Sequence, residues 1–149
     1  MSGVAVRRAL AGNDETGLTA LLEDAKGSFG PLRGGEAFVR SLEPLADTLG
    51  SAVAEGRVWV SQEDAEAFSG LALGWIDENP GWFGVWVRPD WRQRGIGRQL
   101  AREVLHWLSS ENVDSIDAFA LPGDRPTKQL LESLGFKARL LVMRKAEGN

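Results

Sequence analysis

The 149-residue sequence contains no cysteine, no tyrosine and a single histidine, His106. Without cysteine, the chain can form neither a disulfide nor a thiolate zinc site, and it has no thiol nucleophile. One histidine excludes a histidine-rich metal site, so we expect no bound metal. The sequence also lacks a run of about 18 apolar residues and an N-terminal apolar stretch of signal-peptide length. We therefore expect a cytoplasmic protein that does not associate with membranes.

Charge is moderate overall but unevenly distributed. The formal net charge is −4 and 26% of the residues are charged, which argues against both a nucleic-acid-binding protein and a disordered chain. Between Arg88 and Arg102, however, five arginines accompany one aspartate. This concentrated positive field suits a small polyanion better than a long one. The length and the 43% apolar content predict one domain over residues 1–149.

The apolar periodicity predicts an α/β domain. Strands are expected at Val4–Arg8, at Arg57–Ser61 and Phe68–Ile76 as a hairpin, at Trp82–Val87, at Ser115–Leu121 and at Phe136–Met143. Helices are expected after Asn13 or Asp14, at Glu36–Leu42, at Glu43–Ala54, at Ile96–Ser109 and between Asp124 and Gly135, with an irregular glycine-rich loop over residues 27–35. This order predicts a central mixed, mostly antiparallel sheet flanked by helices. One parallel strand pair is joined by the helix that begins at Ile96.

The stretch VRPDWRQRGIGRQL, residues 87–100, leads from a predicted strand directly into a predicted helix. Gly95 and Gly97 fall at the helix N-terminus, where the first backbone N–H groups lack intrahelical partners and favour an anion. Glycine lets a phosphate approach the backbone closely, and arginine recognises phosphate through its planar guanidinium group. The stretch therefore predicts a pyrophosphate-binding cradle.

Other readings of this stretch fit less well. A dinucleotide-binding fingerprint requires a third glycine, but Leu100 stands at that position. The nucleoside-triphosphate loop requires Gly-Lys followed by Ser or Thr, and the sequence has no such tripeptide. A glycine-rich turn with solvated arginines remains the alternative without function.

Two sequence blocks resemble the GNAT superfamily of N-acetyltransferases. Arg92, Gly95 and Gly97 match its acyl-CoA signature, (Q/R)xxGx(G/A), between a strand and a helix. The block ALPGDRPTKQLLESLGF, residues 120–136, is similar to the family's next motif, in which a short helix ends in Gly-Phe. The resemblance implies a GNAT-like fold and transfer of an acetyl group from acetyl-CoA to a primary amine by direct attack. The acceptor would be a small molecule or a protein, and a homodimer is expected because dimers are common in the family.

The resemblance also implies a set of cofactor-binding residues. Val85, Trp86 and Val87 would lie along the pantetheine arm. The pyrophosphate would be held by Arg92, Gln93, Arg94, Gly95, Ile96, Gly97 and Arg98. Asp124 stands where the family often has an asparagine that contacts the cofactor, and it could equally cap the following helix.

The sequence departs from the family at Leu131, where a tyrosine usually protonates the departing thiolate. No other tyrosine can replace it, so Ser133 or a water molecule becomes the candidate acid. A thiol ionises near pH 8.5 and general acid help contributes about 10²–10⁴-fold, so catalysis survives this loss. The missing tyrosine favours one alternative, a CoA-binding sensor without activity. A dinucleotide-dependent oxidoreductase is a third class.

The acceptor side offers several candidates but no single base. Asp117 lies within a predicted strand, flanked by apolar residues, which is locally unusual for a carboxylate. The other candidate bases are Glu78, Asp77 and Glu36. The acceptor pocket is expected to be built by the glycine-rich loop 27–35, the helices that follow it and the tryptophan-rich hairpin. Phe29, Trp75 and Trp82 are expected to make this pocket partly apolar.

Overall fold

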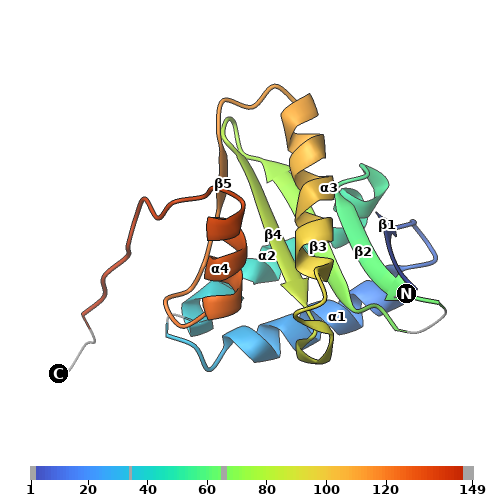
Figure 1. The fold of residues 1–149 in the computed structure, drawn as a ribbon, viewed down its shortest axis with the longest axis horizontal. Coiled ribbons are helices and arrows are strands. Elements are labelled where there is room, and N and C mark those ends of the chain that lie inside the picture. The colour runs from blue at the N-terminus through green and yellow to red at the C-terminus, as the bar shows by residue number, and fades with distance from the viewer. Residues whose placement is uncertain (1–2, 34, 65–66, 146–149) are drawn as a thin grey trace.

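The computed structural model describes residues 3–33, 35–64 and 67–145 (Figure 1). The strands are β1 (Val4–Arg8), β2 (Val58–Glu63), β3 (Gly70–Ile76), β4 (Gly81–Val87) and β5 (Ile116–Ala118). The helices are α1 (Glu15–Phe29), α2 (Gly35–Ala54), α3 (Ile96–Ser110) and α4 (Arg125–Ser133), with a short 3₁₀ turn, η1 (Pro89–Trp91), before α3. No helix in the described ranges combines the length and apolar character needed to cross a membrane.

The five strands form one sheet in chain order, with β1 to β4 antiparallel and β5 parallel to β4. This topology confirms the predicted mixed sheet with a parallel pair. A parallel neighbour requires a crossover connection, and α3 supplies it between β4 and β5. The predicted hairpin is also present, because β2 and β3 pair antiparallel.

Helices cover both faces of the sheet (Figure 1). α1 and α2 pack on one face, where Leu18, Leu21 and Val53 meet Val60 and Leu73 in a buried cluster. α3 and α4 pack on the other face, in a second cluster built around Phe83. α3 reaches that cluster with residues spaced three or four apart, namely Ile96, Leu100, Ala101, Val104 and Leu108. The sheet is therefore buried on both sides, as its apolar strands require.

Two predictions for the segment between β1 and β2 are wrong. The loop expected over residues 27–35 is helical to Phe29, because the helix gains contacts when Phe29 packs against the first cluster, which offsets the cost of an exposed Gly27. The two helices expected at Glu36–Leu42 and Glu43–Ala54 are one helix, α2, whose backbone runs through Pro44. One proline removes a single helical hydrogen bond, and the rest of the helix persists around it.

The C-terminal strands also differ from prediction. β5 is shorter than the expected Ser115–Leu121, since only three of its residues have partners on β4. The final strand expected at Phe136–Met143 is absent. Gly135, at a φ of 93°, ends α4, and Phe136 then packs on Phe83 with ring centroids 5.5 Å apart. Beyond Phe136 the chain leaves the sheet instead of returning to its edge (Figure 1).

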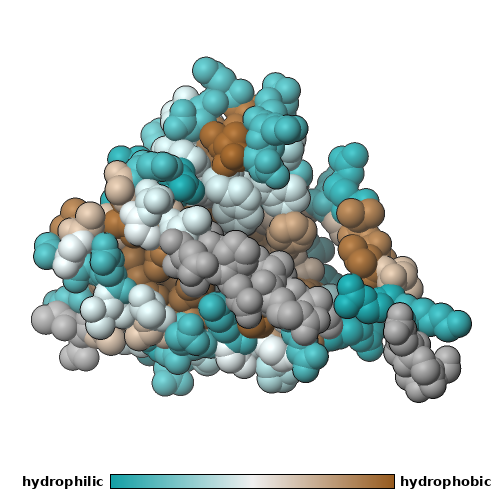
Figure 2. All heavy atoms as spheres, turned by 180° about the vertical axis from the view of Figure 1, so that it is seen from behind, coloured by the Kyte–Doolittle hydropathy of each residue, from teal (hydrophilic) through white to brown (hydrophobic). Residues whose placement is uncertain are grey.

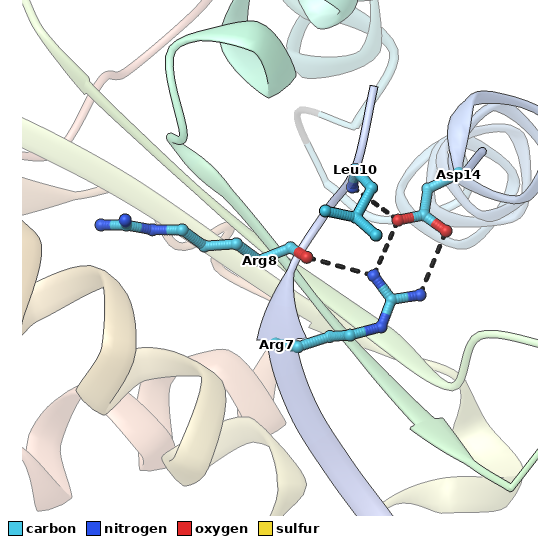
Figure 3. Close-up of polar contacts among 4 residues, drawn as sticks. All are labelled: Arg7, Arg8, Leu10 and Asp14. Carbon is cyan, nitrogen blue, oxygen red and sulfur yellow. Dashed lines mark hydrogen bonds and ion pairs between the residues drawn. The ribbon is translucent and has the colours of Figure 1, made fainter. Parts of the chain in front are cut away.

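An ion pair fixes the junction between β1 and α1 (Figure 3). Arg7 donates from Nη1 to Asp14 Oδ2 at 2.8 Å and from Nη2 to Oδ1 at 3.1 Å. The backbone N–H of Leu10 donates to the same carboxylate at 2.6 Å. Asp14 occupies the N-cap position, as expected, but its side chain makes this ion pair instead of a capping bond. The Arg7 hydrogen bond, with help from Leu10, lowers the pKa of Asp14 despite its burial.

Replacing Asp14 by asparagine should destabilise the fold in a pH-dependent way. The Asp14 pKa is lower in the folded state, so its stabilisation is present above the unfolded pKa and is lost as the pH falls through the folded value. At pH 7 we expect Asp14→Asn to lower the free energy of unfolding by about 1.5–3 kcal/mol, the usual worth of a hydrogen bond to a charged group. The deficit should shrink as the pH approaches about 3. Urea unfolding followed by circular dichroism measures both.

Glu15→Gln is the matched control, because Glu15 is the exposed neighbour of Asp14 in the first turn of α1. A deficit for Asp14→Asn that stays constant between pH 7 and pH 3 would contradict the assigned role of the carboxylate.

Candidate functional site

The pairing of β4 with β5, the last two strands in the order of the sheet, leaves a gap beside the second half of β4. Their parallel pairing runs from Gly81 opposite Ile116 to Phe83 opposite Ala118 and then stops. β4 continues to Val87 because it remains paired with β3 along its whole length. The second half of β4 therefore has a strand neighbour on one side only.

The backbone groups facing this gap belong to Val85 and Val87. Arg88 N donates to Ser69 O on the β3 side at 2.8 Å, and hydrogen-bonded and non-hydrogen-bonded pairs alternate along an antiparallel ladder. Val85 and Val87 therefore direct their peptide N–H and C=O groups away from β3. Arg92 Nε donates to Val87 O at 2.9 Å, which agrees with this orientation and leaves Val85 and the Val87 N–H facing the gap.

The N-terminus of α3 lies directly beyond β4 and η1. Gly95 is the N-cap residue at a φ of 79°, a left-handed conformation that favours glycine, and it supplies no capping side chain. A Cβ added at Gly95 would meet nothing within 4 Å, and one at Gly97 would meet its nearest neighbour, Leu130, at 3.5 Å. The first turn contains no acidic residue that could neutralise the helix end. These open amides are suited to an anion.

Three arginines lie near this helix end, namely Arg92, Arg94 and Arg98. None of them has a carboxylate partner among the described residues. Arg92 is held by Val87 O, and its guanidinium lies 5.9 Å from the centroid of the Trp86 ring. Arg94 lies over the Trp91 ring, at 4.7 Å. Their contacts orient the guanidinium groups but leave their charge available to a ligand.

Arg98 and Arg88 have other partners. Arg98 Nη1 donates to Ser133 Oγ at 3.0 Å, which joins α3 to α4. Arg88 forms an ion pair with Asp24 of α1 and donates to Phe68 O. Arg88 is therefore a structural residue that fastens α1 to the end of β4.

Two adjacent cavities lie between the end of α1 and the loops that follow β4 and β5. The first, of about 150 Å³, is lined by Phe29, Arg92 and Asp124 together with Ser28, Leu32, Gly123 and Pro126. The second, of about 430 Å³, is lined by Asp24, Ser28, Trp86, Arg88, Pro89 and Asp90. Ser28 borders both, and the buried indole N–H of Trp86 has no hydrogen-bond partner among the described residues. The structure thus brings Phe29, predicted for the acceptor, close to Arg92 and Asp124, predicted for the cofactor.

The remaining acceptor candidates gather at the other end of β4. Trp75 and Trp82 are directly opposite each other on β3 and β4, with their rings stacked and centroids 6.4 Å apart. Trp82 also stacks on Phe119, at 4.8 Å. Asp117 is the β5 partner of Trp82 and is half-buried. Because paired residues of neighbouring strands share a face, Asp117 lies on the same side of the sheet as the three aromatic rings.

The other proposed catalytic side chains are exposed, unlike Asp117. Ser133 is exposed on α4, where its hydroxyl donates to Leu130 O at 2.7 Å and accepts from Arg98. Glu78 is exposed in the turn between β3 and β4, at a φ of 59°. Asp77 and Glu36 are exposed as well. Leu131, at the position of the family's tyrosine, is 9% exposed and packs in the second cluster.

Asp124 caps α4, one of the two roles predicted for it. Its carboxylate accepts from Thr127 N at 3.2 Å and from Thr127 Oγ1 at 2.6 Å. The same side chain lines the first cavity.

Sequence reasoning missed Phe119 and did not single out Ser28 or Leu32. Phe119 had a usable signal, because it follows Asp117 by two residues and so occupies the same face. Ser28 and Leu32 lie in the segment 27–35 that was predicted to build the acceptor pocket, and they line the first cavity together with Phe29. In the described part of the chain, no three acidic or histidine side chains converge as a metal site would require.

The chain belongs to the acetyltransferase (GNAT) family, whose sequence model matches residues 19–136. This match includes the gap between β4 and β5, the α3 N-terminus and α4. No curated protein matches the sequence.

Solved structures share the fold at low sequence identity. A GCN5-related N-acetyltransferase from Ralstonia eutropha is 16% identical over 98% of this chain and 100% of its own, with a TM-score of 0.70. The aminoglycoside N-acetyltransferase AAC(6')-Iy, in complex with a CoA-containing bisubstrate analogue, is 19% identical over 97% and 99%, with a TM-score of 0.67. PaiA N-acetyltransferase from Thermoplasma acidophilum, in complex with coenzyme A, is 15% identical over 93% and 92%, with a TM-score of 0.71.

Removing the Asp124 carboxylate should destabilise α4. We expect Asp124→Ala to lower the free energy of unfolding by about 0.5–2 kcal/mol, because the Thr127 N–H loses its acceptor. Asp124→Asn keeps an acceptor oxygen and should stay within a few tenths of a kcal/mol of the natural chain. Urea unfolding of the three proteins tests this, and equal loss in both variants would contradict the capping role.

Proposed function

We propose that this protein is an N-acetyltransferase that transfers the acetyl group of acetyl-CoA to a primary amine in a ternary complex. The observation that carries the proposal is the alignment of three features. Backbone groups of β4 that have no strand partner in the described part of the chain lead to the open amides at the start of α3. Arginines that have no carboxylate partner there surround those amides. Family membership and the CoA complexes of structural relatives support the same cofactor.

The residues present suit the cofactor along its length. A pantetheine arm carries amides, and these can pair with the outward-facing groups of Val85 and Val87 as a further strand would. The Trp86 side chain lies on the other face of β4 from the side chains of Val85 and Val87, and it borders the second cavity. The pyrophosphate would accept from the amides of Ile96, Gly97 and Arg98, as anions do at helix N-termini. Arg92, Gln93 and Arg94 precede those amides, and two of these residues add positive charge.

The acceptor would reach the thioester from the face covered by α1 and α2. Phe29, Trp75 and Trp82 lie on this face and supply apolar surface for it. A lysine-like amine with a pKa near 10.4 is neutral at pH 7 only at a cost of about 4.6 kcal/mol. Asp117 is the base we favour, because it is half-buried beside Trp82, whereas Glu78 is exposed in a turn. The neutral amine nitrogen then attacks the thioester carbonyl directly, and the CoA thiolate leaves.

Protonation of the departing thiolate falls to water in this proposal. Leu131 offers only methyl groups, and the Ser133 hydroxyl already donates to a helical carbonyl. The same observation favours one alternative, a CoA-binding sensor without turnover. Incubation with acetyl-CoA and a panel of amines separates the two, with thiol release and the acetylated amine measured together. Cofactor binding without thiol release on any amine would support the sensor.

A methyl group at Gly97 should weaken cofactor binding without unfolding the protein. Its Cβ would make only ordinary contacts with Leu130 and Val87, so the fold should tolerate Gly97→Ala. The methyl would crowd the amide that faces the phosphates, and we expect the KM for acetyl-CoA to rise about tenfold, equivalent to roughly 1.4 kcal/mol. Gly50→Ala in α2 is the control, since a Cβ there meets nothing within 4 Å. An unchanged KM for acetyl-CoA would contradict the proposed pyrophosphate site at the start of α3.

Replacing Asp117 should affect turnover more than cofactor binding. We expect Asp117→Asn to lower kcat about 10²–10⁴-fold at pH 7, the usual worth of a general base, with an unchanged KM for acetyl-CoA. The difference in kcat between the variant and the natural protein should become smaller above about pH 10, where a lysine-like amine is already neutral. Asp114→Asn, at an exposed carboxylate before β5, is the control. A loss that appears in Glu78→Gln instead would assign the base to Glu78.

A further inference from the structure

Glycines recur within the paired strands β3 and β4, and packing explains all but one of them. A Cβ added at Gly70, Gly74 or Gly81 would lie between 2.7 and 2.9 Å from the nearest atom of another residue, closer than a side chain tolerates. Gly84 differs from these three. It is exposed, and a Cβ there would meet no described atom within 4 Å. Lack of space therefore does not account for the glycine at this position.

The backbone of β4 does not require glycine at this position either. The φ of Gly84 lies outside the left-handed region. The register of β4 on β3 is unbroken there, with Gly84 opposite Leu73, so the strand has no bulge. A glycine inside a strand weakens it, and apart from bulges and bends it marks a place where a ligand approaches the backbone closely. Gly84 therefore points to a ligand.

A side chain at Gly84 would point to the face of the sheet that α1 and α2 cover. Its partner Leu73 is buried in the first cluster on this face, and paired residues of neighbouring strands share a face. Trp82 and Trp86, two residues away on either side, share it as well. Figure 2, seen from behind Figure 1 and so from the side of α2, shows pale and brown residues at the surface among the teal ones. The two helices therefore leave the backbone of β4 exposed between two indole side chains.

This exposed backbone, which we call the Gly84 opening, leads to the gap beside β4. The pairing of β4 with β5 ends at Phe83, and the next residue after Gly84, Val85, directs its peptide groups into the gap. Toward β3 the way is closed by Leu73, which is 3% exposed. A molecule that enters from the face of α1 and α2 therefore reaches the gap over Gly84, where no side chain stands in its path.

Aromatic rings and a carboxylate lie beside the Gly84 opening. Trp82 is stacked between Trp75 and Phe119, with centroids 6.4 and 4.8 Å away. Asp117, the β5 partner of Trp82, is half-buried on the same face. Aromatic rings provide apolar surface for methylene groups and attract cations, and a carboxylate attracts an ammonium group. These surroundings suit an alkylammonium ion.

We propose that Gly84 determines the specificity for the acceptor, and that the acceptor is a primary amine on an unbranched alkyl chain. The methylene that carries the reacting nitrogen would occupy the space that a Cβ at Gly84 would fill. A second carbon on that methylene would have to lie against Trp82 or Trp86. This inference rests on the proposed acetyltransferase function and names the substrate class of the same site.

The transfer itself is the one proposed above. The neutral amine nitrogen forms a bond to the acetyl carbon, and the C–S bond breaks with its electron pair on sulfur. A proton of the nitrogen passes to Asp117. Gly84 takes part in none of these steps, so it is a positioning residue whose effect is on which amine reaches the thioester.

Two isomeric amines test the assignment. Butylamine and sec-butylamine have the same atoms and charge, but only sec-butylamine is branched at the carbon that bears the nitrogen. The natural protein should favour butylamine about 10–200-fold in kcat/KM, the usual worth of one carbon in a close-fitting site. Gly84→Ala should lower kcat/KM for butylamine by a similar factor, and Gly84→Val further, with an unchanged KM for acetyl-CoA. Gly50→Ala is the control and should change neither value.

The fold should tolerate both substitutions. A Cβ at Gly84 has open space among the described residues, and alanine and valine restrict the unfolded chain more than glycine does. The temperature of thermal unfolding should therefore not fall below that of the natural protein. Three results would overturn the proposal: a lower unfolding temperature, equal acetylation of the two isomers by the natural protein, or an unchanged kcat/KM for butylamine in Gly84→Val.

Binding measured without turnover separates this proposal from the proposed function. Saturation-transfer NMR detects butylamine bound to the protein in the presence of CoA, which has no acetyl group to donate. The signal should appear with the natural protein and with Gly50→Ala, and it should be lost with Gly84→Val. If this holds but no amine is acetylated, the proposed function fails and the amine site at Gly84 stands. If amines are acetylated but Gly84→Val keeps the signal, or if the natural protein gives none, the site at Gly84 is wrong.

Discussion

The separation of β4 from β5 after Phe83 and Ala118 is the constraint on which the rest of the site depends. β4 is paired with β3 along its whole length, whereas its pairing with β5 ends at Phe83. Val85 and Val87 therefore have peptide groups that face outward. α3 begins just beyond the same strand, which directs its first amides to the same end of the gap. Backbone geometry, more than any single side chain, thus prepares this protein for a long, hydrogen-bonding, anionic ligand.

Side chains then decide how much positive charge remains at that end. The arginine-rich stretch divides into two groups that the sequence does not distinguish. Arg88 is neutralised by Asp24 and fastens α1 to the sheet. Arg92 and Arg94 are oriented by backbone carbonyls and tryptophan rings, and neither has a carboxylate partner among the residues that the structure describes. Neutral anchors of this kind position a guanidinium without weakening its attraction for phosphate.

Local pattern predicted those elements whose stability is set locally. The spacing of Ile96, Leu100, Val104 and Leu108 predicted α3, and Gly95 and Gly97 lie at its N-terminus as predicted. Errors arose where tertiary packing overrides local preference: Phe29 packs on the core and keeps α1 helical past Gly27. The segment after Phe136 has the composition of a strand, yet residues 137–145 do not pair with the sheet. At Asp124 the sequence alone could not distinguish two roles, because capping α4 and contacting a ligand in the first cavity place the carboxylate in the same position.

The absence of tyrosine, first a puzzle for catalysis, has an optical consequence. With six tryptophans and no phenol, the emission of this protein on excitation at about 295 nm comes from its indole rings. One of them, Trp86, is buried beneath the guanidinium of Arg92, next to the gap in the sheet. Any ligand that draws that cation toward itself changes the electric field across the ring. The protein therefore carries a built-in spectroscopic reporter within reach of its own binding site.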